Sequence, residues 1–278
     1  MTAREIAMRR NTSLLFRPFA HAAAGGMLAA LVLGLGLGPV DAADEAPTPP
    51  DVSWSFEGPF GTYDRAELQR GYQVYREVCA ACHSMDLLSF RNLGQPGGPE
   101  FSADQVAAMA AQVEVTDGPD DTGEMFTRPG VPSDAFPAPF PNDQAARAAN
   151  GGALPPDLSV IVKARPNGAD YIHGLLVGYQ DPPAGFELTP GMSYNLYFPG
   201  HQIAMPPPLN EGQVEYADGT EATVERMARD VTAFLAWAAE PKLEARHRLG
   251  FQVMIYLIVL AVLLYFSKRR IWARLGHA

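Results

Sequence analysis

Residues 70–83 read RGYQVYREVCAACH and end in the motif CAACH at positions 79–83. Two cysteines three positions apart lie on one face of a helix, so both thiols can bind the same flat group. The C-x-x-C-H pattern is typical of covalent c-type haem attachment, with thioether bonds at Cys79 and Cys82 and with His83 as an iron ligand. The motif therefore predicts one covalently bound haem c.

The motif has three other interpretations. A thioredoxin-like dithiol is expected beside a βαβ pattern, and none flanks residues 79–83. A structural zinc ion takes about four Cys, His or carboxylate ligands, but the sequence has only two cysteines and its other histidines stand singly. A disulfide between Cys79 and Cys82 leaves His83 without a role. Haem attachment alone uses all three residues.

Helical spacing precedes the motif. Leu68, Tyr72 and Tyr75 recur at intervals of three and four residues, and Thr62 or Asp64 can cap the start of this helix. A glycine at position 71 lowers helix stability by up to about 1 kcal/mol. Its presence suggests that another helix approaches closely there; the alternative is an ordinary surface glycine.

A second amphipathic helix is expected over residues 224–238. Thr220 or Thr223 can begin it, and Pro241 lies just beyond its end. We expect this helix to pack on the one that leads to the haem motif. It should keep four charged residues in water, namely Glu225, Arg226, Arg229 and Asp230.

The composition limits the class of protein. The 278 residues are 47% hydrophobic and 19% charged, which suits a folded core, and 26 Gly with 25 Pro predict long loops. A net charge of −10 argues against nucleic-acid binding.

Residues 43–241 alone hold 28 acidic and 10 basic residues, a net charge near −18. This field favours a basic soluble partner, and the acidic stretches 114–124 and 211–225 are candidate docking faces.

Both ends of the chain look like targeting or anchoring segments. Residues 1–42 combine early arginines, an apolar run and an A-x-A-like site, which predicts a secretory signal peptide. Residues 249–267 carry no charge, and at about 1.5 Å per residue they can cross a ~30 Å hydrocarbon core once. We expect a periplasmic haem domain over 43–248, a transmembrane helix over 249–267 and a cytoplasmic tail over 268–278. No two-part presequence is evident, which favours a bacterial inner membrane.

The sixth iron ligand decides what such a site can do. A methionine closes that position and suits electron transfer, whereas an open position suits oxygen chemistry. Met205 stands directly before three prolines, which fix the backbone around it. We therefore favour Met205, with His201, Met192 and Met125 as alternatives.

Several runs together resemble one family. They are residues 70–83, 145–158 (AARAANGGALPPDL), 197–200 (YFPG), 203–207 (IAMPP) and 234–241 (FLAWAAEP). In this order, and with a single C-terminal anchor, they are similar to the bacterial type of the cytochrome c1 family, the haem subunit of the cytochrome bc1 complex. The motif at 79–83 alone would not separate this family from other c-type cytochromes.

The resemblance implies a mainly α-helical, class I cytochrome c-like domain with long Gly/Pro-rich loops and one C-terminal membrane helix. It implies axial iron ligation by His83 and Met205, Arg165 beside a haem propionate and Tyr171 close to the haem. The chain departs from many relatives after Arg165, where Pro166 and Asn167 replace His-Gly. Residues 114–128 resemble a lineage-specific acidic loop without an assigned role.

The resemblance also implies a function and partners. The chain would take one electron from a Rieske iron-sulfur subunit and pass it to a basic soluble cytochrome c. It would lie beside cytochrome b and membrane lipid in a dimeric complex, as an electron-transfer subunit that is not catalytic alone. Two alternatives stay open: a self-sufficient membrane-anchored electron carrier, and an exported haem peroxidase with an open sixth position.

Overall fold

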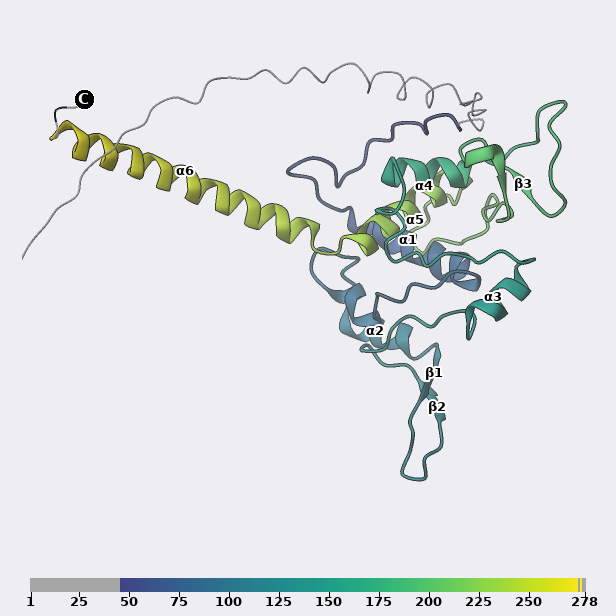
Figure 1. Ribbon diagram of the computed structural model, residues 1–278. Coiled ribbons are helices and arrows are strands. Elements are labelled where there is room, and N and C mark those ends of the chain that lie inside the picture. The colour runs from purple at the N-terminus through teal and green to yellow at the C-terminus, as the bar shows by residue number, and fades with distance from the viewer. Residues whose placement is uncertain (1–45, 275, 277–278) are drawn as a thin grey trace, which may run out of the picture. The chain divides into compact units, whose positions relative to one another are not determined.

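The computed structural model describes residues 46–274 and residue 276 (Figure 1). The predicted signal peptide, residues 1–42, lies outside the described residues. The described chain is mainly helical, as the sequence predicts. Its α-helices are α1 (Arg65–Glu77), α2 (Ala103–Ala110), α3 (Asp143–Ala149), α4 (Gly168–Val177), α5 (Val224–Ala239) and α6 (Leu243–Ala273).

Short strands and single helical turns join these helices. Strands β1 (Glu114–Asp117) and β2 (Phe126–Pro129) form one antiparallel pair, and β3 (Ser193–Tyr194) and β4 (Gln202–Ile203) form another. Three 3₁₀ turns complete the described elements: η1 (Cys79–Ala81), η2 (Phe90–Gly94) and η3 (Pro199–His201). Long Gly- and Pro-rich loops connect them, which agrees with the composition.

Helix α1 begins at the predicted cap. The Asp64 carboxylate accepts hydrogen bonds from the backbone N–H groups of Ala66 and Glu67, at 2.9 and 3.2 Å. The helix ends at Glu77, so Cys79 begins the 3₁₀ turn η1 that follows it, and Cys82 is the residue directly after this turn. Both cysteines line one cavity, although they do not share one helix as the spacing predicts.

Helices α1 and α5 pack closely, and α4 packs against α5 (Figure 1). Gly71 permits this approach, because a methyl group there would collide with the carbonyl oxygen of Asp230. The Thr223 hydroxyl caps α5 by accepting from the Arg226 N–H at 3.1 Å. The predictions of a close helix contact at Gly71 and of a cap at Thr223 are confirmed.

The prediction that Asp230 faces water is wrong. Its side chain is fully buried, and its two oxygens accept from Nε and Nη2 of Arg70 at 2.9 and 3.0 Å. Arg229 is half-buried, and its Nε donates to the Glu67 carboxylate at 3.0 Å. A bidentate guanidinium satisfies both oxygens of a carboxylate, so an acidic residue fits within this helix interface.

The acidic segment at residues 114–128 is a β-hairpin. Val115 pairs with Arg128 and Thr116 with Thr127 across β1 and β2. The Arg128 guanidinium donates to Asp134 and to Asp117, which ties the hairpin to the following loop. The β-branched residues Val115, Thr116 and Thr127 and the aromatic Phe126 favour strands, and a Gly-containing turn joins them.

Helix α6 is the one described helix long and apolar enough to cross a membrane, with a mean hydropathy of 2.4 over its most apolar stretch. It starts before and ends after the predicted span at 249–267. Lys, Arg and Glu are good helix formers, so the helix continues through the charged residues on both sides of the apolar stretch.

Candidate cofactor site

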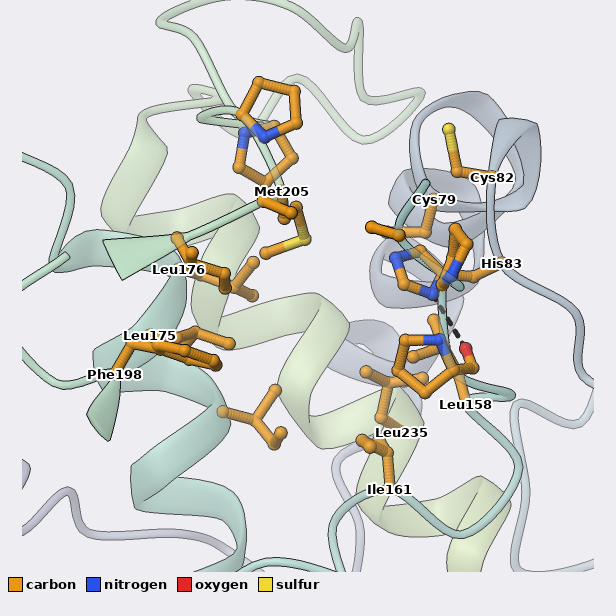
Figure 2. A pocket seen from close by; sticks show the side chains of 18 of the residues that line it. Cys79, Cys82, His83, Leu158, Ile161, Leu175, Leu176, Phe198, Met205 and Leu235 are labelled. Carbon is orange, nitrogen blue, oxygen red and sulfur yellow. Dashed lines mark hydrogen bonds between the residues drawn. The ribbon is translucent and has the colours of Figure 1, made fainter. Parts of the chain in front are cut away.

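A cavity of about 490 Å³ lies between η1, the loop at 150–165, α4, α5 and the chain after β4. This volume falls in the range of ~300–1,000 Å³ typical of small-molecule and cofactor pockets. Its walls are mostly apolar, and Leu158, Ile161, Leu175, Leu176, Phe198 and Leu235 are among the lining side chains shown in Figure 2. The structure brings all six predicted site residues to this cavity: Cys79, Cys82, His83, Arg165, Tyr171 and Met205.

The His83 ring is fixed by a hydrogen bond. Its Nδ1 lies 2.8 Å from the carbonyl oxygen of Pro156, shown as the dashed line in Figure 2. Because a carbonyl only accepts, Nδ1 carries the proton and Nε2 keeps its lone pair. Burial lowers the pKa of His83, which favours the neutral form. A metal-binding histidine needs both features.

A carboxylate holds the backbone around His83. Asp157 accepts from the Ser84 hydroxyl, from the Asp86 N–H and from the Ser159 N–H, each at 2.8 Å. Burial by itself raises the pKa of Asp157, but these hydrogen bonds together lower it by a larger amount. The pKa of Asp157 therefore lies below its ordinary value of 3.8. Sequence reasoning missed both Pro156 and Asp157. Their one signal was their position in the Pro-Pro-Asp-Leu run.

Met205 reaches the cavity from the opposite wall. Strand β4 pairs with β3 and leads directly into the segment that contains Met205. The Tyr179 hydroxyl donates to the Met205 carbonyl at 3.1 Å, and three prolines follow. Figure 2 shows the Met205 thioether and the His83 imidazole extending toward each other across the cavity.

The alternative sixth ligands lie elsewhere in the described structure, since none of them lines the cavity. His201 is buried against Tyr194, with ring centroids 5.5 Å apart and nearly parallel planes. Met192 and Met125 are exposed. Met205 is therefore the predicted candidate that the fold places opposite His83, and its bond to iron stays a prediction.

Arg165 and Tyr171 line the cavity on the side of α4. The Arg165 guanidinium is exposed and donates to the Ala164 carbonyl at 3.1 Å. Burial raises the pKa of the Tyr171 phenol, and the charge of Arg165 partly offsets this shift. Both residues line the cavity, and their positions relative to a haem stay predictions.

The two cysteines are free thiols. Burial raises the pKa of Cys79 to about 12, with a further contribution from Cys82. Across residues 46–274, no three His, Cys, Asp or Glu side chains gather as a metal site would require. The cavity thus offers two thiols on one wall, an imidazole beside them and a thioether opposite.

The sequence model of the Cytochrome C1 family matches residues 54–275. The chain belongs to the cytochrome c1 family. It is 49% identical over 240 residues to "Cytochrome c1" of Rhodospirillum rubrum, covering 81% of this chain and 87% of that protein. It is 50% identical over 263 residues to "Cytochrome c1 1, heme protein, mitochondrial" of Arabidopsis thaliana, covering 91% of this chain and 84% of the relative.

A third relative is longer. "Cytochrome b/c1" of Bradyrhizobium diazoefficiens is 53% identical over 244 residues, which cover 81% of this chain and 36% of that protein. This chain therefore spans about a third of that relative's length. The family match includes the whole cavity and all of α6.

Proposed function

We propose that this cytochrome c1 chain is the membrane-anchored haem c subunit of a cytochrome bc1 complex. It takes one electron from a Rieske iron-sulfur protein and passes it to a basic soluble cytochrome c, and it assembles with cytochrome b in a dimeric complex. The observation that supports this most directly is the placement of His83 and Met205 on opposite walls of one apolar cavity.

The residues of the cavity fit a c-type haem. Cys79 and Cys82 would form the thioether bonds, and Nε2 of His83 and the sulfur of Met205 would bind the iron. Haem supplies a one-electron iron couple when bound, and a His/Met ligand pair raises its potential. Arg165 would lie beside a propionate and Tyr171 near the ring. The apolar walls exclude water, which keeps the site suited to electron transfer.

The chain holds both ligand-bearing segments rigidly. The Pro156 carbonyl orients the His83 ring, and Tyr179 fixes the Met205 backbone before a rigid proline run. Electron transfer is favoured when little rearrangement accompanies a change of charge. This rigidity supports an electron carrier over an oxygen-activating enzyme, which needs an open position.

We further propose that residues 43–248 lie in the periplasm and residues 268–278 in the cytoplasm of a bacterial inner membrane. The apolar stretch of α6 supports a single crossing. The predicted signal peptide at 1–42 supports export of the domain that precedes this crossing.

Spectroscopy of the Met205→Leu variant tests the ligand assignment. We expect it to keep covalent haem but to lose the far-red methionine-to-iron charge-transfer band and to bind carbon monoxide when reduced. Met192→Leu is the matched control, because Met192 is exposed and outside the cavity, and it should keep the band. A band that survives in Met205→Leu, or carbon monoxide binding by the unaltered protein, would contradict the proposal.

Two further measurements test attachment and assembly. The Cys79→Ala and Cys82→Ala double variant should lose haem staining after denaturing electrophoresis. The unaltered chain should co-purify with cytochrome b and with quinol-oxidising activity. Purification of a stable, haem-loaded chain without these partners would instead favour a self-sufficient electron carrier.

A further inference from the structure

Phe60 lies outside the aromatic cluster formed by its neighbours. Phe56 stacks on Trp54 with centroids 5.5 Å apart and contacts Tyr63 at 5.1 Å, so these three rings pack together. Phe60 belongs to the same segment, yet 77% of it is exposed. Burial of this ring against a contacting apolar surface would be favourable.

The loop that carries Phe60 is a closed turn. The Thr62 N–H donates to the Ser55 carbonyl at 3.0 Å, and Gly58 adopts a left-handed backbone with a φ of 75°. Gly61 leaves no room for a side chain, because a methyl group there would overlap the backbone of Phe56 and Glu57. We call residues 57–62 the Phe60 loop. Its backbone presents Phe60 at the tip.

This loop lies against the start of helix α6. The Phe60 ring meets that of Phe251 edge-to-face, with centroids 6.2 Å apart. Nδ1 of His247 is 3.2 Å from the Gly61 carbonyl and donates to it. These two contacts connect the Phe60 loop to the first turns of the helix that can cross a membrane.

Glu244 fixes the same junction through charge. Its two oxygens accept from Nη1 and Nη2 of Arg65, both at 2.8 Å, and Oε1 also accepts from the Tyr63 N–H at 3.0 Å. The hydrogen bonds from Arg65 lower the pKa of Glu244, so it is ionised at neutral pH. The pair links α6 to the N-terminus of α1 and to the residue just after the Phe60 loop.

The depth of Phe251 sets the depth of Phe60. Arg248 is the last charged residue before the apolar stretch of α6. Phe251 follows three positions later, about 5 Å along the helix axis. This distance corresponds to the boundary between headgroups and acyl chains, where amphipathic segments bury their apolar side chains. Phe60 touches Phe251 and therefore lies at the same level.

We propose that the Phe60 loop is a second membrane contact of this chain, and that Phe60 inserts into the headgroup–acyl boundary of the leaflet on the haem-domain side. Arg248 on α6 and Lys242 just before the helix are exposed on the domain side of this level, and Arg246 between them pairs with Glu240. Long cationic side chains at this position can reach the headgroups. The inserted loop and the Glu244 junction would fix the tilt of the haem domain on the bilayer. This inference does not depend on the identity of the electron donor or acceptor.

A spin label at position 60 tests the proposal. The Phe60→Cys variant is assembled in its complex in lipid nanodiscs, labelled with a nitroxide, and probed by collision with oxygen, which enters lipid, and with a nickel chelate, which stays in water. Met125→Cys in the exposed β1–β2 hairpin is the matched control. The unaltered protein must take no label, and haem staining of the same sample separately checks that its own cysteines are occupied.

The proposal requires oxygen access and chelate exclusion at position 60, with an oxygen-to-chelate collision ratio several-fold above that at position 125. Chelate access equal to that at position 125 would place Phe60 in water and overturn it. Exclusion of both probes would show that another protein subunit covers the loop, which also overturns it. A second variant tests the Glu244 junction. When Glu244→Ala is added to the labelled Phe60→Cys chain, access of the nickel chelate to position 60 should rise. Unchanged collision rates would show that Glu244 does not hold the loop in place.

Discussion

At the scale of single residues, buried and exposed ion pairs should differ sharply in their effect on stability. Asp230 is fully buried and paired with Arg70. We expect Asp230→Asn to lower the free energy of unfolding by about 3 kcal/mol, because it leaves part of a guanidinium charge uncompensated in the interior. The exposed pair of Arg76 and Glu77 is the control, and Glu77→Gln should cost less than about 1 kcal/mol. Denaturant unfolding of both variants measures this, and equal losses would contradict it.

Asp157 should make the His83 loop sensitive to acid. Its folded-state pKa lies below 3.8, so its contribution to stability is present above that pH and is lost as the pH falls through the folded-state value. Asp157→Asn should therefore melt at a lower temperature than the parent at pH 7, and the difference should shrink below pH 3.8. Asp121→Asn, in the exposed hairpin turn, should show no such pattern. A difference that persists at low pH would assign the effect to shape rather than charge.

At the scale of elements, the contact between α1 and α5 depends on the absence of a side chain at position 71. We expect Gly71→Ala to reduce the free energy of unfolding by about 1–3 kcal/mol, because the added methyl group meets the Asp230 backbone and forces the helices apart. Gly250→Ala is the control. Nothing lies within 4 Å of that position, so helix propensity alone should leave stability unchanged or raise it by up to about 1 kcal/mol. Thermal unfolding separates the two outcomes.

The sequence predicts these elements where the deciding interaction is local. The Asp64 and Thr223 caps and the apolar spacing of α1 and α5 involve residues only a few positions apart. The burial of Asp230 could not be predicted, because its partner Arg70 is 160 positions away. The bond from His83 to Pro156 spans 73 positions for the same reason. The β1–β2 hairpin was missed because its acidic composition resembles that of a solvated loop.

At the scale of the whole molecule, charge should control the encounter with a soluble partner. Both acidic segments contain a residue that is already paired within the chain. Asp117 in the hairpin pairs with Arg128, and Asp218 in the segment at 211–225 pairs with Arg70. Glu215 and Glu221 stay exposed in the segment that begins shortly after Pro208, which lines the cavity. We therefore expect the segment at 211–225, rather than the hairpin, to steer a basic cytochrome c toward the site.

Paired charge reversals distinguish the two segments. The rate of electron transfer from the reduced chain to a basic cytochrome c should fall as salt is added, because screening shortens the reach of the field. Glu215→Lys with Glu221→Lys should lower the low-salt rate and flatten its salt dependence. The control pair, Asp120→Lys with Asp121→Lys, changes the net charge by the same amount but within the hairpin. If the field near the segment at 211–225 steers the partner, this pair should change the rate less. Equal effects would show that net charge alone steers the encounter, and a rate independent of salt would exclude steering altogether.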